Sequence, residues 1–238
     1  ASIDENKNAL LENFRNTSDL ILYDFVTDNN IKVLLCYIDN FIDRNTLDRD
    51  VIEPIVTKLE NVKDIKKVLY VSSIKELNDF NEIIDFILYG SVAIFLEGMN
   101  NAFVFDLKSW EKRSIEEPPS EGVIRGPKEG FVEDIDVNRV LIRKKIKKSS
   151  LVFEDYKLGR ITETKISICY IDGIANERVL DEVKDRILHI DTDSILDSGY
   201  VEQFIEDSPK SIFSTIGDTQ KPDVVAGRLL EGRVAVLC

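Results

Sequence analysis

Apolar residues recur along this chain with two different spacings, and each spacing predicts a different element. Short runs of Leu, Ile and Val bounded by turn residues, such as Asp28-Asn29-Asn30, are typical of strands inside a sheet. Apolar residues three or four positions apart, such as Leu10, Leu11 and Phe14, predict a helix that buries one face. These rules predict strands at residues 20–27, 31–38, 68–72, 91–96, 102–107, 151–158, 165–171 and 232–238. They predict helices at residues 4–16, 45–61, 73–89, 133–147, 176–189, 199–206 and 222–232.

The predicted strands fall into two sets that resemble each other in sequence. Leu20-Ile21-Leu22-Tyr23-Asp24-Phe25 corresponds to Leu151-Val152-Phe153-Glu154-Asp155-Tyr156. Cys36-Tyr37-Ile38-Asp39 corresponds to Cys169-Tyr170-Ile171-Asp172, and Gly90-Ser91-Val92-Ala93-Ile94 to Gly232-Arg233-Val234-Ala235-Val236. The three matches keep the same order, with offsets of 131, 133 and 142 residues, which indicates a duplicated unit.

The order of the predicted elements favours an α/β fold, because strands alternate with helices. The hairpin-like strand pair early in each copy predicts mixed rather than purely parallel sheets. Between the copies, Pro118-Pro119-Ser120-Glu121-Gly122 and Arg125-Gly126-Pro127 interrupt the pattern. We therefore predict two similar tandem α/β lobes joined by a Pro- and Gly-containing linker, with the first lobe at residues 1–117, the linker at 118–130 and the second lobe at 131–238.

Composition and charge narrow the function classes. The net charge of −13 argues against nucleic-acid binding, which needs a basic face. The longest uncharged apolar run, residues 86–96, is shorter than the ~20 residues that span a bilayer. Of the three cysteines, Cys36 and Cys169 fall in predicted interior strands and are expected to be small core residues, which favours a reducing compartment.

Signatures of catalysis and of metal or cofactor binding are missing from the sequence. No nucleophile elbow or dinucleotide fingerprint occurs, and residues 122–128 lack the spacing of a phosphate loop. The one histidine, His189, is expected to stabilise a helix end. The acidic segment Asp191-Thr192-Asp193 with Asp197 fits helix capping and turns better than a calcium loop. No catalytic residue, metal ligand or cofactor is therefore predicted.

A local reversal of charge marks the predicted helix at 133–147. Residues 139–148 contain six basic residues and no acidic one. Val137, Leu141, Ile142 and Ile146 are expected to face inward, so that the basic residues line the outer surface. This surface is either solvated and paired with the chain's own acids, or a docking site for an acidic partner or anionic lipid headgroups. The candidate docking residues are Arg139, Arg143, Lys144, Lys145 and Lys147.

A longer pattern around the linker is the most specific feature of the sequence. Arg125-Gly126-Pro127-Lys128-Glu129-Gly130-Phe131-Val132-Glu133 precedes Asn138-Arg139-Val140-Leu141-Ile142-Arg143-Lys144-Lys145-Ile146. Tyr170-Ile171-Asp172-Gly173-Ile174-Ala175-Asn176 and Leu229-Leu230-Glu231-Gly232-Arg233-Val234-Ala235 follow. Together these motifs closely resemble the signature of the spore germinant receptor A-subunit family (GerA type).

That resemblance implies a function which the residues alone do not show. In the family a soluble N-terminal domain precedes membrane-spanning helices, so we expect the natural protein to continue into a membrane domain. The A subunit works with B and C subunits and other A subunits in the spore inner membrane, with this domain on the cytoplasmic (core) side. The resemblance thus implies non-enzymatic nutrient-signal transduction and receptor assembly during spore germination.

The signature also allows a physical interpretation as a hinge between the lobes. Gly126, Pro127 and Gly130 would fix a tight path, and Glu133 would cap the next helix or neutralise its N-terminus. Asn138, with a counterpart in Asn8, would make a structural hydrogen bond. The hinge hypothesis covers Arg125, Gly126, Pro127, Gly130, Phe131, Glu133 and Asn138.

Two other function classes remain to be weighed against signal transduction. Two similar lobes with a Gly-Pro hinge would suit a small-molecule or ion-binding module with its ligand in the crevice between them. No convergent set of polar groups marks such a site in the sequence. An enzyme is the least favoured class, because neither a nucleophile nor a phosphate cradle is found.

Overall fold

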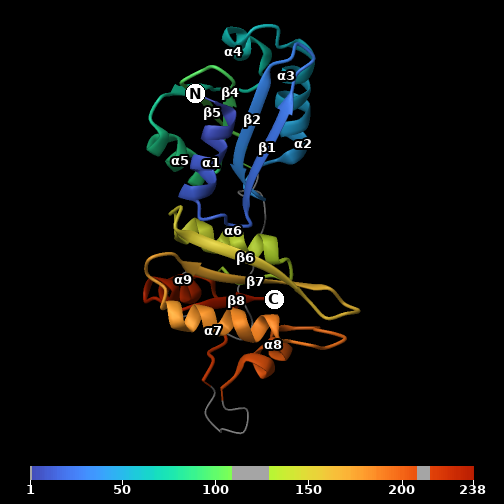
Figure 1. Cartoon of the computed structure of the whole chain (residues 1–238), viewed down its shortest axis with the longest axis vertical. Coiled ribbons are helices and arrows are strands. Elements are labelled where there is room, and N and C mark those ends of the chain that lie inside the picture. The colour runs from blue at the N-terminus through green and yellow to red at the C-terminus, as the bar shows by residue number, and fades with distance from the viewer. Residues whose placement is uncertain (1, 109–128, 208–214) are drawn as a thin grey trace. The chain divides into compact units, whose positions relative to one another are not determined.

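The computed structural model describes residues 2–108, 129–207 and 215–238. These residues fall into two compact units (Figure 1). The first contains residues 2–108 together with Lys147–Ser149, and the second contains residues 129–146, 150–207 and 215–238. Most of the predicted linker, including Arg125, Gly126 and Pro127, lies outside the described residues.

The first unit is built on a five-stranded sheet in the order β1-β2-β4-β5-β3. Both faces of its central strands are covered, because every residue of β4 is buried. The strands are β1 (Leu20–Val26), β2 (Lys32–Ile38), β3 (Lys75–Leu77), β4 (Ser91–Leu96) and β5 (Ala102–Asp106). The helices are α1 (Ile3–Asn13), α2 (Arg44–Leu47), α3 (Glu53–Lys58), α4 (Ile65–Val68) and α5 (Phe80–Leu88), with a π turn at Asp48–Ile52 and a 3-10 turn at Val62–Asp64.

The predicted helix at 45–61 is interrupted, and Pro54 explains why. Proline has no backbone N–H, so it cannot donate to the carbonyl of Asp50 one turn earlier. That carbonyl instead accepts the N–H of Tyr70 at 3.1 Å. The π turn lies at this point in the chain, between α2 and α3.

The segment 68–89 differs most from the sequence prediction. No strand forms at 68–72, where α4 ends at Val68, and the predicted helix at 73–89 starts later. Asp79 caps α5 by accepting the N–H of Asn81 at 2.9 Å, so the helix begins at Phe80. Residues 75–77 instead form β3, which pairs with the edge of β5.

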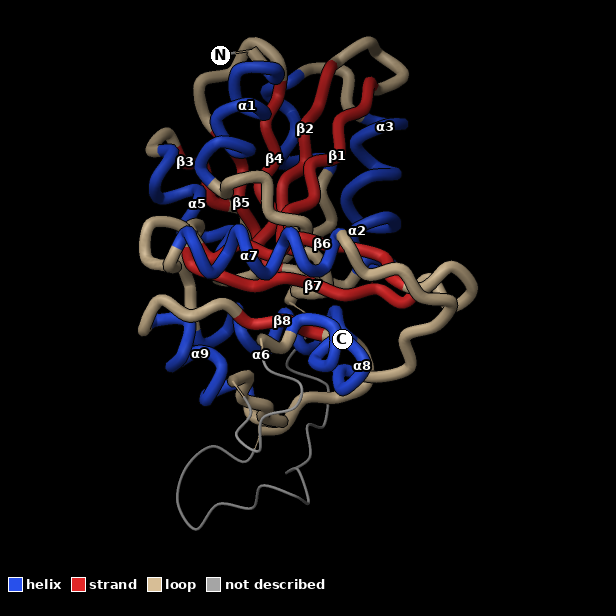
Figure 2. Tube along the Cα trace, turned by 60° about the horizontal axis from the view of Figure 1, so that its bottom comes forward, coloured by secondary structure: helices blue, strands red, loops and turns tan. Residues whose placement is uncertain are grey.

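The second unit has a three-stranded sheet with helices on both faces (Figures 1 and 2). One core cluster joins Ile142, Phe153 and Leu229, on the face of α6 and α9, and the other joins Val152, Ile187 and Val201, on the face of α7 and α8. The strands are β6 (Leu151–Leu158), β7 (Thr164–Ile171) and β8 (Ala235–Leu237). The helices are α6 (Ile135–Lys145), α7 (Glu177–Leu188), α8 (Ser198–Ile205) and α9 (Pro222–Leu230). No helix in the described ranges is long and apolar enough to cross a membrane.

The two sheets share one pairing register at the positions that match in sequence. Leu20 pairs with Ile38 as Leu151 pairs with Ile171. On the next strand pair, Cys36 lies opposite Ala93 and Cys169 lies opposite Ala235. Both cysteines are fully buried, which confirms their predicted place in the core.

The helices repeat as well. Helices α1 and α6 both have 11 residues, and α5 and α9 both have 9. Gly90 and Gly232, which follow the second helix pair, have φ values of 88° and 85°, a conformation that favours glycine. The repeat detected in three strand motifs therefore extends to the helices that flank them.

The α/β fold class is confirmed, whereas the expected mixed sheets are not found among the described strands. Every strand pair in both sheets is antiparallel. Alternation of strands with helices does not determine the direction in which the next strand enters the sheet. The prediction of mixed sheets expected parallel pairs beside the antiparallel hairpin, but β2 and β4, which a helical segment connects, also pair antiparallel.

Candidate functional site

Residues 129–132, here called the strap, are bound to α6 chiefly by the side chain of Asn138. The Asn138 carbonyl oxygen accepts the Val132 N–H at 2.8 Å, and its amide NH2 donates to the Val132 carbonyl at 2.7 Å. Asn138 is 5% exposed, whereas Val132 is 39% exposed, so the two bonds are shielded from water on the α6 side only. The side chain thus pairs with the strap backbone as a neighbouring strand would, which confirms the predicted structural hydrogen bond.

Two further contacts fix the strap at its other residues. The Phe131 N–H donates to the Gln220 carbonyl at 2.8 Å, just before α9, and the Phe131 ring packs against the core. The Lys145 ammonium pairs with the Glu129 carboxylate at 2.6 Å. The strap is therefore joined to both helices on this face of the second sheet.

Helix α6 is attached to the sheet by a cluster of charged side chains. Arg139 pairs with Asp155 of β6 and lies 3.3 Å from Asp136. Lys165 of β7 reaches Asp136 at 2.7 Å and Asp155 at 3.5 Å, and Ser167 donates to Asp155 at 2.9 Å. Arg139 is 5% exposed, so its charge is compensated within the fold rather than by solvent.

Arg143 is fully buried, one helical turn beyond Arg139. Its guanidinium donates to the Leu151 carbonyl at 3.0 Å and lies 5.2 Å from the centre of the Phe153 ring. Such stacking over an aromatic face suits arginine. The prediction that Arg139 and Arg143 line an outer surface is therefore wrong, because β6 lies beneath both and offers them partners.

The lysines differ from the two arginines in burial. Lys144 is half-buried, whereas Lys145 and Lys147 are exposed. Lys145 pairs with Glu129, and Lys147 lies beyond the end of α6, in the segment grouped with the first unit. The basic surface of α6 is thus reduced to Lys144 and Lys145.

The remaining signature residues have different roles. Glu133 is exposed and does not cap α6, because the helix starts at Ile135 and Asp134 accepts the N–H groups of Asp136 and Val137. Gly130 is buried within the strap. Asn8, the proposed counterpart of Asn138, is exposed.

The opposite face of the sheet carries a polar cluster that sequence reasoning missed. Glu154 accepts hydrogen bonds from Tyr170 at 2.6 Å, Lys184 at 2.7 Å and Tyr156 at 3.1 Å. Burial opposes the charge on Glu154, but the bonds from Lys184 and the tyrosines outweigh it and lower the pKa of its carboxyl. Burial and the Glu154 charge raise the pKa of Tyr156 to about 12. A signal was present in the sequence, since Glu154 directly follows the apolar run Leu151-Val152-Phe153 within a predicted strand.

The residues considered for catalysis or metal binding have structural roles. His189 follows α7, with Nδ1 2.7 Å from the Asp185 carbonyl oxygen. Asp197 caps α8 by accepting the Gly199 N–H at 2.8 Å, and Asp193 pairs with Arg160 at 2.9 Å. Within the described ranges, no group of three or more His, Cys, Asp or Glu side chains is placed to hold a metal ion.

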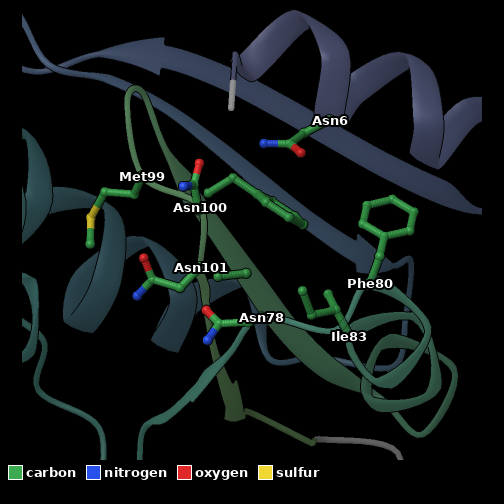
Figure 3. Close-up of a pocket in the computed structure, with 9 residues that line it drawn as sticks. Asn6, Asn78, Phe80, Ile83, Met99, Asn100 and Asn101 are labelled. Atoms are coloured by element: carbon green, nitrogen blue, oxygen red, sulfur yellow. The ribbon is translucent and has the colours of Figure 1, made fainter.

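A small hollow lies in the first unit, between α1, α5 and the β4–β5 turn (Figure 3). It encloses about 40 Å³, little more than one water molecule occupies. Asn6, Asn78, Asn100 and Asn101 line it together with Phe80, Ile83, Phe95, Met99 and Ala102. Ligand pockets usually measure ~300–1,000 Å³, so this hollow does not fit a nutrient-sized molecule.

Of the predicted sites, the strap and α6 form the most developed polar arrangement. Asn138 bonds to the strap backbone, Arg139 to Asp155 and Arg143 to the Leu151 carbonyl, while the buried Nε of Arg139 has no hydrogen-bond partner among the described residues. These bonds hold a chain segment against a helix and a helix against a sheet. The arrangement positions the chain that enters the second unit, and it brings no nucleophile together with a base.

Comparison with known proteins identifies relatives along the whole chain. Spore germination protein KA of Bacillus subtilis is 37% identical over 229 residues, which cover 93% of this chain and 42% of that protein. Spore germination protein B1 of the same organism is 34% identical over 243 residues, covering 100% of this chain and 50% of that protein. The chain thus spans about half the length of these curated relatives.

A solved structure shares the fold. The crystal structure of the N-terminal domain of the A subunit of the Bacillus megaterium spore germinant receptor GerK3 superposes with a TM-score of 0.69 and 30% identity. The match covers 99% of this chain and 90% of that one. The profile of the Bacillus/Clostridium GerA spore germination protein family matches residues 8–238. The chain therefore belongs to the GerA spore germination protein family.

Proposed function

We propose that this chain is the N-terminal domain of a germinant receptor A subunit and acts as a non-enzymatic signalling and assembly module in spore germination. The observation that carries the proposal is the strap, in which the family signature is used to fix the chain entering the second unit onto α6. A segment held by a paired amide and an ion pair can transmit a displacement to the helix it contacts. The match to the GerK3 A-subunit domain supports the same assignment.

The proposal extends to partners and location. The domain would face the cytoplasmic (core) side of the spore inner membrane and would contact B and C subunits and other A subunits of a receptor. Nucleic acid is not a partner, because the chain carries a net charge of −13. Lys144 and Lys145 are the proposed docking residues on α6, with anionic lipid headgroups as a second class of contact.

Charge reversal tests docking in the full-length protein. Lys144→Glu with Lys145→Glu should slow nutrient-induced germination at least tenfold while leaving receptor abundance unchanged. The matched control, Lys157→Glu with Arg178→Glu, changes the same number of charges at exposed positions of the second unit and should germinate normally. Normal germination of the Lys144/Lys145 variant would contradict docking through α6.

The ligand-binding alternative makes a different prediction. A germinant that binds this domain directly must raise its melting temperature in a saturable manner, since it selects the folded state. Amino acids, sugars and common ions at millimolar concentration are the probes. A saturable rise in melting temperature would indicate that the domain senses the germinant directly instead of relaying a signal.

A further inference from the structure

Strand β1 forms one edge of the five-stranded sheet and is almost entirely apolar. Among the strands that the structure describes, it pairs with β2 alone. Six of its seven residues are apolar, yet none of them is buried. Tyr23 is 45% exposed and Val26 is 53% exposed. The outer row of β1 backbone N–H and C=O groups therefore lies beside exposed apolar side chains.

The other described sheet edges carry the protection that β1 lacks. Folded proteins guard edges with short strands, charges, proline or bulges, because an open edge pairs with other chains. Strands β3 and β8 have three residues each. Strand β6 has three charged residues in the second half of its sequence, Glu154, Asp155 and Lys157. Strand β1 has seven residues with no Lys, Pro or Gly, and its one charge, Asp24, pairs with Lys7 at 3.0 Å.

Comparison with the matching strand of the second copy shows that this exposure is specific to the first. Leu151, Val152 and Phe153 of β6 are fully buried, whereas the matching Leu20, Ile21 and Leu22 of β1 are half-buried. The ion pair from helix to strand is also more open, because Asp24 is 55% exposed and Asp155 is 28% exposed. Strand β1 therefore has apolar residues at these matching positions, as β6 does, although in the first unit these residues are only partly covered.

We propose that β1 is a docking edge for an extended segment of a different protein, which adds to the sheet as a sixth strand. Main-chain hydrogen bonds to β1 would supply the affinity, and alternate side chains would supply the specificity. The occupant needs apolar residues at every second position, to cover the half-exposed residues of β1. It also needs basic residues within or beside the docked segment, because the unit that contains β1 is acidic.

Charge argues for a basic partner rather than a second copy of this chain. Residues 1–108 contain 19 acidic and 11 basic side chains, and the whole chain carries −13. Two such surfaces repel each other. Strand β1 itself offers Asp24 and no positive residue to a second β1.

Site-specific photo-crosslinking tests the proposal in the full-length protein within the cells that make it. A benzophenone amino acid replaces Tyr23 in one variant and Phe25 in another, two positions on the same face of β1. The control places it at Tyr89, which is 54% exposed in the same unit. Mass spectrometry then identifies the crosslinked residues of the partner.

A strand that pairs with β1 should give a regular pattern of crosslinks. Tyr23 and Phe25 should crosslink to residues two positions apart in one segment of another protein, with a Lys or Arg between or beside them. Crosslinks to a second copy, to another part of the same chain, to unrelated residues, or no more crosslinking than at Tyr89, would each overturn the proposal.

Lysine substitutions provide an independent measurement. Tyr23→Lys with Val26→Lys places on β1 the charges that guard natural edges, and should reduce the Phe25 crosslink at least tenfold. Tyr89→Lys with Val179→Lys adds the same charge at other exposed apolar positions and should leave it unchanged. Equal crosslinking in both double variants would show that no strand docks on this edge.

Discussion

The side-chain amide of Asn138 makes two hydrogen bonds to one backbone residue, and this determines what its replacement should do. Asn138→Ala removes both part-buried hydrogen bonds to Val132, and should cost about 0.5–1.5 kcal/mol of unfolding free energy. Asn138→Asp keeps an acceptor for the N–H and should be less damaging. Chemical denaturation measures both, with Asn8→Ala as the exposed control. An alanine variant as stable as the parent would show that the strap is held without Asn138.

Gly232 is a second residue where the structure permits little change. Its φ is 85°, and a Cβ there would lie 2.8 Å from the Ile174 carbonyl oxygen. Gly232→Ala should therefore destabilise the chain by about 1–3 kcal/mol. Gly227→Ala, five residues earlier in α9, meets no atom within 4 Å and should be neutral or slightly stabilising. Thermal unfolding of the two variants gives the comparison, and equal melting temperatures would contradict it.

Sequence reasoning at the residue scale succeeded where chemistry is local and failed where it depends on the neighbouring strand. The capping role of Asp197 and the burial of the two strand cysteines followed from residue type and position, whereas the expected cap at Glu133 did not form. The burial of Arg143 could not be predicted, because it depends on the Leu151 carbonyl and the Phe153 ring of β6. Helical periodicity does not show which polar partners lie beneath a helix.

At the scale of the element, α6 combines buried arginines with more accessible lysines, and charge reversal should separate the two. Arg143→Glu would bury a carboxylate beside the Leu151 carbonyl, and should cost more than about 3 kcal/mol. Lys144→Glu should change stability by less than about 0.5 kcal/mol. Denaturant titration distinguishes them. If Arg143→Glu had the same unfolding free energy as the parent, Arg143 would lie at the surface, as helical periodicity predicts.

Long elements with regular patterns were predicted to within a few residues, and short ones were not. Strands β4 and β6 have their predicted starting residues, because apolar runs between turn residues leave little choice. Strand β3 was missed because three residues with two charges carry no pattern, and its pairing with β5 is decided by the tertiary structure. Pro54 was visible in the sequence. Its effect depends on Tyr70, whose N–H donates to the Asp50 carbonyl that Pro54 leaves without a helical partner.

At the scale of the whole molecule, the Glu154 cluster predicts a loss of stability in alkali. The pKa of Tyr156 is raised from 10.0 to about 12, and that of Tyr170 is also raised, mainly by burial. The folded state therefore favours neutral tyrosine, and this contribution is complete below pH ~10 and lost as pH rises through ~12. Melting temperatures between pH 9 and 12 should fall less steeply in the Tyr156→Phe with Tyr170→Phe variant. Parallel curves for variant and parent would contradict this.

The duplicated plan of the molecule could be predicted because the matching motifs are apolar and lie in strands. The lobe boundaries at 117 and 131 remain predictions, since most of the linker lies outside the described residues. Strand direction was predicted incorrectly, because a helical crossover is compatible with either direction. The curated relatives extend well beyond the span matched here, so the coupling of this domain to the rest of a receptor is to be tested in the full-length protein.

The shared register of the two sheets has a consequence for folding. A chain that contains the same hairpin twice can mispair, with the hairpin of one copy inserted into the sheet of the other. Helix α6 carries Arg143 where the 11-residue match of α1 places Leu11. Placed over β1 and β2, α6 would bring a buried guanidinium to Leu22 instead of the Phe153 ring. The two arginines buried on α6 would then disfavour its placement on the sheet of the first unit during synthesis.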